Sequence, residues 1–461
     1  MRIYYFSIIT FLFLHSTLVL SKRLLEVEPE NYIIVDSDEE KFKLLKDGHK
    51  FVDVTDILQF DQIDNDIDDK QISWSEYIKS FIHFNKRKHL QKRSDVDESI
   101  KFWKQYQIFS FQDLIFDDSV LIKEERLPSN IKELVKVDLP KKPNQQKKFS
   151  SVYDKIESTV KQDLYVFINH FTQFYTRFYK SSFGKDASDW LFSQANQAIN
   201  EAESQLPESL QKLNLLSVSK FTHKNFIQDS ILIKIKGFKS LEEKVDSKSV
   251  IIASHLDSIN LLFPYLLRAP GVDDNATGTS VSYFIFKTYL DYLVANAIEQ
   301  SNDNLNKNIW PVNDIEFHFY AAEEGGLLGS LDVFASKSSQ NAKIISMLQL
   351  DQLGYNELKT KGKIGLINDF VSEDVFEFLK LLIKNYLNVD FEVDTCGYGC
   401  SDHASAYKYG FPSGMVCESV LKNDNKFTHS ALDTIDRVDF DWLEQFVKLG
   451  LSFVLELASY E

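Results

Sequence analysis

Short apolar runs alternate with long helical patterns in the later part of the chain, and this alternation limits the possible folds more than any other feature. Four runs are predicted to be strands: residues 230–238, 249–254, 315–322 and 344–350. Two segments have the three- and four-residue apolar spacing of helices, residues 281–294 and 371–386. This order is typical of an α/β fold in which a mostly parallel mixed central sheet is flanked by helices. Ligands of such folds bind beyond the carboxyl ends of the strands.

A helix is expected to precede these strands, starting at residue 151. Its apolar positions recur at helical steps: Val152, Ile156, Val160, Leu164, Ile168 and Phe171. We expect the main domain to comprise residues 149–461. Residues 22–148 are dense in charge and should form a less regular region, either a propeptide or an accessory region.

The N-terminus has the pattern of a secretory signal. Met1 and Arg2 precede an apolar run at residues 3–20. We expect residues 1–21 to be a signal peptide and the protein to be secreted, although an uncleaved signal anchor is the alternative. Basic pairs at 22–23 and 92–93 could be processing sites that make residues 22–148 the propeptide of a zymogen, or they could be chance.

Charge and cysteine content restrict the partners and the compartment. Acidic residues exceed basic ones by 68 − 52 = 16. A negative chain repels phosphate backbones and anionic headgroups, so we expect no nucleic acid partner and, after signal removal, no membrane partner. Of the three cysteines, Cys396 and Cys400 lie four positions apart and Cys417 is left over. One local bridge and one free thiol fit an oxidising compartment.

Residues able to bind metal directly follow three of the predicted strands. His255 follows the run at 249–254, the pair Glu323-Glu324 follows 315–322, and Asp351 follows 344–350. Asp274, in a turn before a helix, and His429, in a late loop, complete the set. Each residue alone has an ordinary structural explanation. His318, for example, alternates with two phenylalanines and is expected on a strand face, and His403 remains unassigned.

The set as a whole predicts a pair of metal ions. Two imidazoles and three carboxylates suit two divalent first-row ions, zinc above all, with one carboxylate bridging. Asp274, Glu324 and Asp351 supply three negative charges against four positive ones, and a bridging hydroxide closes the balance. Glu323 is then free to carry a proton, and Asp257 can hold the second ring nitrogen of His255.

Several strings make the chain recognisable. HLDSIN, RAPGVDDNATGTS, FYAAEEGGLLGS, LQLDQLGY, CGYGCSDHAS and HSALDT resemble those of secreted fungal-type leucine aminopeptidases, a family of co-catalytic di-zinc metallopeptidases. The resemblance covers roughly residues 151–461. It implies the zinc-exopeptidase fold, two Zn²⁺ per chain, and peptides with a free N-terminus as substrates.

The resemblance also implies a role for each matching residue. Asp274, rather than Asp273, would bridge the two ions. One ion would take His255 and Asp351, and the other would take Glu324 and His429.

Glu323 would be the general base, and Tyr398 would help to stabilise the oxyanion. The family's small disulfide loop matches Cys396 and Cys400, and its function would be to orient Tyr398.

The substrate pocket differs from that of the family. Positions that often hold large apolar residues in relatives here hold Gln352, Cys417, Leu421, Asp424 and Thr428. A more polar pocket predicts a weaker preference for leucine and better tolerance of polar or basic N-terminal residues. The alternative is that surrounding loops restore an apolar pocket.

Two other functions compete with an aminopeptidase. A single-zinc glutaminyl cyclase has a related fold, but the presence of both His255 and Asp351 argues against it. A non-catalytic peptidase-like binding domain would have lost metal ligands, and all are present here. We further expect a monomer, and no glycan at the sequon of Asn275 because this turn should pack at the metal site.

Overall fold

The computed structural model describes residues 132–241, 247–261, 263–299, 310–356 and 362–460, and three short strands before them. The chain divides into two compact units, residues 1–111 and 112–461. In the first unit, β1 (Leu24–Val27) pairs antiparallel with β2 (Tyr32–Val35) and with β3 (Phe51–Asp53). The predicted signal peptide, both basic pairs and most of the predicted propeptide lie outside the described residues.

The second unit is built on an eight-stranded sheet with the order β10-β9-β11-β8-β6-β7-β5-β4. The strands are β4 (Leu216–Phe221), β5 (Ser230–Ile235), β6 (Ser249–His255), β7 (Asp314–Tyr320), β8 (Ile344–Leu350), β9 (Lys363–Ile367), β10 (Asp390–Asp394) and β11 (Ser413–Cys417). The pairs β7-β6, β6-β8, β8-β11 and β9-β10 are parallel. The pairs β4-β5, β5-β7 and β9-β11 are antiparallel. The predicted mostly parallel mixed sheet is confirmed.

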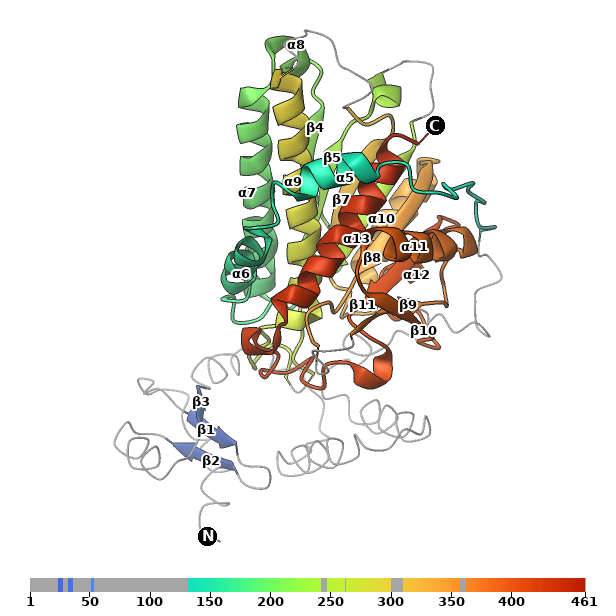
Figure 1. The fold of residues 1–461 in the computed structure, drawn as a ribbon. Coiled ribbons are helices and arrows are strands. Elements are labelled where there is room, and N and C mark those ends of the chain that lie inside the picture. Colours follow the sequence, from blue (N-terminus) through green and yellow to red (C-terminus); the bar gives the residue numbers. More distant parts are fainter. Residues whose placement is uncertain are drawn as a thin grey trace. The chain divides into compact units, whose positions relative to one another are not determined.

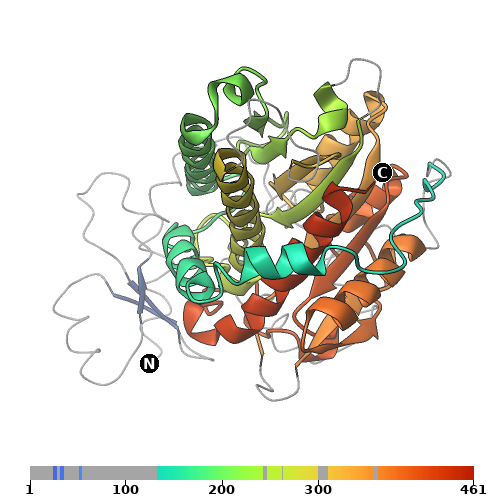
Figure 2. The same cartoon turned by 45° about the horizontal axis from the view of Figure 1, so that its top comes forward.

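Helices cover both faces of this sheet, as predicted. The longer ones are α7 (Ser182–Gln205), α9 (Gly278–Glu299), α10 (Leu328–Ser339), α11 (Glu373–Tyr386) and α13 (Phe440–Ala458). The short helices are α8 (Glu208–Gln211) and α12 (His403–Lys408). Figures 1 and 2 show α9 and α13 side by side over one face. They approach closely because α13 has glycine at position 450, where a Cβ atom would lie 2.2 Å from Ile285 of α9.

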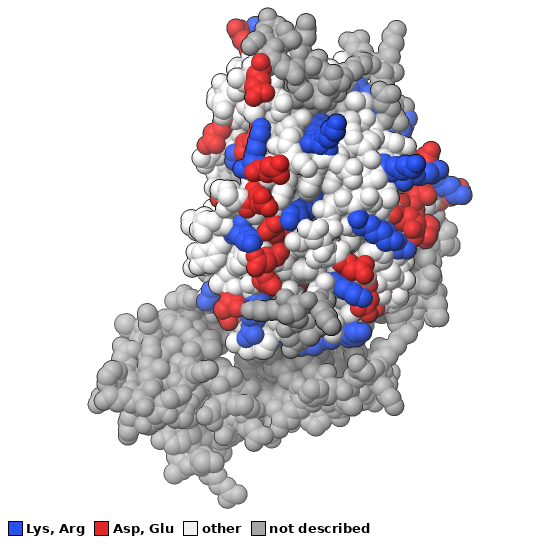
Figure 3. All heavy atoms as spheres, viewed as in Figure 1, with Lys and Arg blue, Asp and Glu red and all other residues white. Residues whose placement is uncertain are grey.

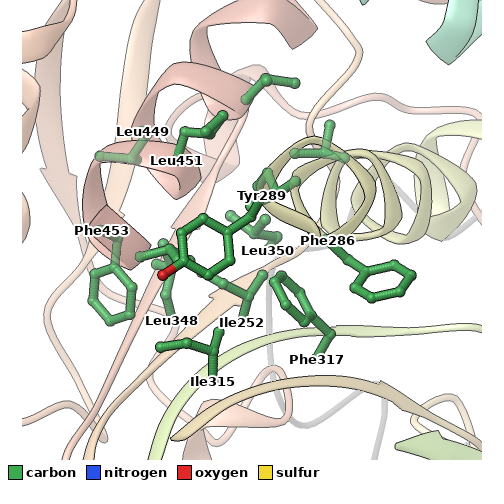
Figure 4. Packing of buried hydrophobic residues seen from close by; sticks show 14 of the residues in the cluster. Ile252, Phe286, Tyr289, Ile315, Phe317, Leu348, Leu350, Leu449, Leu451 and Phe453 are labelled. Atoms are coloured by element: carbon green, nitrogen blue, oxygen red, sulfur yellow. The ribbon is translucent and has the colours of Figure 1, made fainter. Parts of the chain in front are cut away.

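The core is divided by the two-residue period of the strands. On β6, Val250 and Ile252 belong to the large cluster beneath α9 and α13, whereas Ile251 and Ala253 pack on the opposite face with Phe334 of α10. Figure 4 shows Ile252 among aromatic and aliphatic side chains from α9, α13 and the neighbouring strands. A central strand buried on both faces explains why its sequence is apolar without alternation.

The helix predicted from residue 151 is instead two helices. One is α5 (Gln146–Tyr153), the other is α6 (Val160–Phe171), and turns occupy 154–159. Phe149 of α5 packs against Tyr386, with 4.9 Å between ring centroids, whereas Phe171 of α6 stacks on Trp190 of α7 at 5.5 Å. The prediction of a single helix was wrong because its two halves pack against different neighbours, and one straight helix cannot reach both.

The segment at residues 132–148, termed the strap below, lies against the main domain. The backbone N–H of Val135 donates to the carbonyl of Gly410 at 3.1 Å. The amides of Asn144 and Gln145 both donate to one carboxylate oxygen of Glu456, at 2.9 and 3.1 Å. The strap therefore packs with the domain that was predicted to begin at residue 149, although the boundary as a processing site stays a prediction.

The surface of the described residues carries both signs of charge. Figure 3 shows lysine and arginine side chains interspersed with aspartate and glutamate on the face in view. Among the described residues, no helix combines the length and the apolar character that crossing a bilayer requires.

Candidate metal centre

Three neighbouring strands bring the candidate ligands to one edge of the sheet. The order β8-β6-β7 places the end of β6, at His255, between Asp351, which directly follows β8, and Glu323-Glu324, which follow β7. The carboxyl ends of parallel strands meet at the same edge, which is where α/β folds bind their ligands. The sheet order therefore explains why residues nearly 100 positions apart lie together.

Five predicted ligands form two overlapping groups around Asp274. The Nε2 atom of His255 lies 3.2 Å from Asp274 Oδ1 and 3.2 Å from Asp351 Oδ1. The Nε2 atom of His429 lies 2.9 Å from Asp274 Oδ2 and 3.2 Å from Glu324 Oε2. Each group of three donor atoms fits within 4.8 Å. Asp274 thus offers one oxygen to each group.

The backbone around Asp274 is fixed by the carboxylate of Asp433, which no sequence pattern marks. Asp433 accepts hydrogen bonds from the amides of Asp273 and Asp274 at 3.0–3.1 Å. The carboxylate of Asp273 is directed elsewhere, accepting from Gly354 N at 2.8 Å and Asn425 Nδ2 at 3.0 Å. This difference explains why only the second of the two adjacent aspartates lies between the imidazoles.

Asn275 lies wholly inside the same turn. Its side chain donates to Leu350 O at 3.0 Å and accepts from Gly278 N at 2.9 Å, and none of it is exposed. The peptide bond between Asp274 and Asn275 is cis. The absence of a glycan at this sequon stays a prediction, and the burial supports it.

Asp257 lies beside a candidate ligand and binds the backbone of the candidate base. Its Oδ1 lies 3.5 Å from His255 Nδ1, as expected for an outer carboxylate. The same carboxylate accepts from the backbone amides of Glu323 at 3.0 Å and Glu324 at 3.1 Å. One buried side chain therefore positions residues from the ends of two strands.

The negative charges in the site favour the binding of a cation. Burial opposes protonation of His255, yet the charges of Asp351 and Glu323 raise its pKa well above the ordinary value. For His429, burial again opposes protonation, and Glu324 and Asp274 raise the pKa well above the ordinary value. The donor chemistry and the surplus of negative charge both fit divalent ions held by nitrogen and oxygen ligands.

Glu323 is the carboxylate beside the two groups that belongs to neither. Burial raises its pKa well above the ordinary range, and Asp351 and Asp402 add to this against the opposing charge of His255. Burial likewise raises the pKa of Glu324, to about 7.

Two further residues, which no sequence pattern marks, hold the candidate ligands or their neighbouring backbone in place. Ser401 donates through Oγ to Asp351 Oδ2 at 2.5 Å. The fully buried Arg177 donates to the carbonyls of Leu256 and Gly271, both at 2.8 Å, and so ties the segments after β6 and before Asp274. Ser401 lies in a string quoted above, but neither residue type indicates a role by itself.

Tyr398 lies between the two bridged cysteines. The disulfide Cys396–Cys400 is formed, as predicted, and Cys417 is free and buried. The Tyr398 side chain is 40% exposed. Desolvation and the charges of Glu323 and Asp351 raise the pKa of its hydroxyl to about 12.

The predicted pocket residues lie on β11, its following loop and the segment after β8. Gln352 donates through Nε2 to Asp274 Oδ2 at 3.3 Å. Cys417 ends β11 and donates its thiol to Ser419 O at 3.0 Å. Leu421, Asp424 and Thr428 follow in the loop and are half-buried.

His318 and His403 belong to neither group of candidate ligands. His318 is buried on a face of β7, 2.7 Å from Glu316 Oε2 and 2.8 Å from the hydroxyl of Tyr320. His403 begins α12 and is buried with its Nε2 3.3 Å from the carbonyl of Asp369. The strand-face position expected for His318 is confirmed.

Comparison with known proteins places the chain in a family. Residues 235–454 match the family described as Peptidase family M28. A Saccharomyces cerevisiae protein named as a probable aminopeptidase is 36% identical over 309 residues, which cover 67% of this chain and 76% of the relative. Leucine aminopeptidase 1 of Coccidioides posadasii is 36% identical over 334 residues, 71% of this chain and 78% of the relative. The chain therefore belongs to peptidase family M28.

Solved structures support the fold. The LapA aminopeptidase of Legionella pneumophila has a TM-score of 0.58 at 20% identity, covering 96% of this chain and all of that one. LapB from the same organism also has a TM-score of 0.58 at 20% identity, covering 95% and 99% of the two chains. At this identity the likeness concerns the α/β architecture alone.

Proposed function

We propose that this protein is a zinc aminopeptidase that hydrolyses the N-terminal peptide bond of peptides and proteins at two zinc ions, with Glu323 as general base. The observation that carries the proposal is Asp274, whose two oxygens lie beside the imidazoles of two different three-residue groups. A shared carboxylate of this kind serves two ions rather than one. The names of the curated relatives support the substrate class.

His255 and Asp351 would hold one ion, Glu324 and His429 the other, and Asp274 would bridge them. Two bound zinc ions would lower the pKa of a shared water and polarise the carbonyl of the scissile bond.

Glu323 accepts the proton of the attacking water and transfers it to the leaving amine. Since Asp257 holds the amides of Glu323 and Glu324 together, the base keeps its position relative to its neighbouring ligand.

Tyr398 supplies a hydrogen bond where negative charge develops on the carbonyl oxygen. Its pKa of about 12 keeps the hydroxyl protonated at neutral pH, which a donor requires. The free α-amine of the substrate has two candidate acceptors, a metal ion for its neutral form and the site's carboxylates for its charged form. Both would explain a strongly acidic site.

We also propose that residues 1–21 direct secretion, that residues 22–148 act as a propeptide and that the protein is a monomer. The disulfide Cys396–Cys400 fits an oxidising compartment. The net charge of −16 supports peptides, rather than nucleic acid or membranes, as partners.

The test combines metal content with three substrates. We expect two zinc ions per chain and release of p-nitroaniline from leucyl-p-nitroanilide that a chelator abolishes and zinc restores. N-acetyl-leucyl-p-nitroanilide, which lacks a free amine, should not be cleaved. Glu323→Gln should retain both zinc ions and lose about 10²–10⁴-fold in kcat.

Other outcomes separate the competing functions. One zinc per chain with cyclisation of an N-terminal glutamine would identify a cyclase. A chain without metal that binds peptides and cleaves none would identify a binding domain. Equal cleavage of the acetylated substrate would rule out an aminopeptidase.

A further inference from the structure

A serine, a histidine and an aspartate outside the metal centre are joined by hydrogen bonds. Oδ2 of Asp332 lies 2.8 Å from Nδ1 of His223, and Nε2 of His223 lies 2.9 Å from Oγ of Ser230. Asp332 belongs to α10, His223 lies in the loop between β4 and β5, and Ser230 begins β5. The series ends at the backbone amide of Ala321, which donates to Ser230 Oγ at 2.9 Å. The proposed mechanism uses none of these three side chains.

The direction of each hydrogen bond follows from the chemistry of the groups. A carboxylate only accepts, so Nδ1 of His223 carries a proton and donates to Asp332. Burial lowers the pKa of His223 against the opposing effect of Asp332, so the ring is neutral at pH 7 and its Nε2 is an acceptor. The hydroxyl of Ser230 therefore donates to Nε2, and its oxygen is free to accept from the amide of Ala321.

The same three residue types form the nucleophilic triads of some hydrolases, but here they cannot form a second active site. Ser230 is 0% exposed and His223 is 5% exposed. A nucleophile has to reach a substrate carbonyl, and this hydroxyl oxygen instead faces a backbone amide. The function of the three side chains therefore lies in the backbone that they hold.

That backbone is the bend that leads from β7 into the candidate site. Ala321 is the first residue after β7, and β5 pairs antiparallel with β7, so Ser230 lies beside the point where β7 ends. Ala322 then adopts φ 55°, a left-handed conformation that residues other than glycine adopt when their surroundings hold them there. The peptide that Ser230 binds thus directly precedes the bend that directs Glu323 into the site.

Asp257 holds the same bend from its other side. Its carboxylate accepts from the amides of Glu323 and Glu324. Ser230 holds the amide before the bend, and Asp257 holds the amides after it. The candidate base is therefore positioned by two anchors, and without Ser230 only one of them remains.

Aromatic rings fix the imidazole in this arrangement. His223 stacks on Phe226, with 4.5 Å between ring centroids and 23° between the planes. Phe226 packs edge-on against Tyr179 at 5.3 Å. Tyr179 in turn lies against Gly325, where an added Cβ atom would be 2.7 Å from its ring. The rings that orient His223 thus also contact the turn that carries the candidate base.

We propose that Ser230, His223 and Asp332 are positioning residues for the general base: they fix the peptide of Ala321 and thereby the place of Glu323. This inference rests on the proposed aminopeptidase function. The three residues touch neither substrate nor metal ion and take no part in proton transfer. They act on kcat, because a displaced base slows deprotonation of the attacking water and leaves the binding of the substrate unchanged.

The test compares variants of the zinc-loaded full chain with leucyl-p-nitroanilide as substrate. Ser230→Ala should lower kcat by about tenfold or more and leave KM near the wild-type value, because the base is misplaced. His223→Gln keeps an oxygen that can accept from the Ser230 hydroxyl, and it should retain most of the wild-type kcat. His223→Asn, whose shorter amide reaches Asp332 but not Ser230, should behave like Ser230→Ala.

The control variant is Ser452→Ala in α13. It removes a buried hydroxyl that donates to Leu449 O at 2.7 Å, far along the chain from the bend. If kcat fell only because a buried hydroxyl was lost, this variant would show the same fall, but we expect it to match the wild type. Equal kcat for His223→Gln and His223→Asn, or for Ser230→Ala and Ser452→Ala, would overturn the proposal.

Hydrogen–deuterium exchange of the same variants tests the inference without relying on activity. The amides of residues 321–328 should exchange faster in Ser230→Ala and His223→Asn than in the wild type, and those of α13 should not change. If the wild type cleaved no substrate, the proposed function would fail while this measurement still decided about positioning. Faster exchange confined to the bend would support the role of the three residues, and unchanged exchange would refute it.

Discussion

Ser401 shows how a residue outside the proposed ligand set can hold a candidate ligand in place. Its hydroxyl donates to Asp351 Oδ2 at 2.5 Å, while the other oxygen, Oδ1, faces His255 at 3.2 Å. This hydrogen bond holds the carboxylate in one orientation, with Oδ1 directed towards His255. The Oδ1 atom of Asp257 lies 3.5 Å from the other ring nitrogen of His255, Nδ1.

We expect Ser401→Ala to weaken zinc binding about 10–100-fold, because outer hydrogen bonds of metal ligands have effects of this size. At saturating zinc, kcat should stay near that of the wild type. Competitive titration against a zinc chelator measures the affinity. Ser405→Ala, which removes a buried hydroxyl bonded to Ser330 rather than to a ligand, is the control. Equal zinc affinity of both variants would show that Ser401 has no positioning role.

At the scale of helices and strands, α5 contains a lysine in an unfavourable position. Burial lowers the pKa of Lys148 from 10.5 to about 8, with its ammonium 5.2 Å from the ring centroid of Tyr292. A depressed pKa means that the unfolded chain binds more protons between pH 8 and pH 10.5, so folding stability rises with pH in that window. Below pH 8 the cost of burying the charge is fully present.

Lys148→Met should therefore raise the melting temperature at pH 7, by about 2 °C or more. The advantage should shrink as the pH rises from 8 towards 10, because the wild-type lysine loses its charge there. Thermal denaturation at several pH values measures this. Lys147→Met, at the exposed neighbouring position, should have little effect at any pH. A gain for Lys148→Met that does not depend on pH would contradict the explanation.

The strands also show how much of the fold could be predicted from the sequence. The central strands were predicted because strands buried on both faces are continuously apolar, as in residues 249–254. The run at 315–322 was predicted two residues too long, because Ala322 turns to positive φ, 55°, where the chain directs Glu323 into the site. The edge strand β10, with sequence DFEVD, has no apolar run and is recognisable only from its pairing with β9.

The candidate site was predictable in its residue types but not in its geometry. The ligands that follow strands could be read from the order of the runs. The position of His429 beside Asp274 depends on a loop 155 residues later in the chain, and only the family resemblance suggested it. Asp433 and Arg177 were missed because they act on backbone groups, which leaves no pattern in the sequence.

At the scale of the whole molecule, the strap links the start of the described main domain to its end. Glu456 of α13 is 1% exposed, and its carboxylate accepts from two strap amides and from the hydroxyl of Tyr386. Tyr460 donates to the strap carbonyl of Asp138. Without residues 132–148, a buried carboxylate loses two of these donors.

We therefore expect two truncations, each made by cleaving the folded protein at an engineered protease site, to differ in stability. A chain that begins at Lys132 should unfold in urea at the same midpoint as the uncut protein. One that begins at Phe149 should lose about 2–4 kcal/mol, because hydrogen bonds to a buried charge are lost. Equal midpoints for both chains would show that the strap contributes nothing to folding.

The strap also sets an order of events during synthesis. Residues 132–148 emerge from the ribosome about 300 residues before α13. At a translation rate on the order of 5–20 residues per second, the strap therefore waits tens of seconds for its partner Glu456. The main domain thus cannot fold in order from its first residues. A premature stop codon within α13, before Glu456, would leave the strap without its partner. The strap can therefore form its contacts with Glu456 only after translation has passed α13.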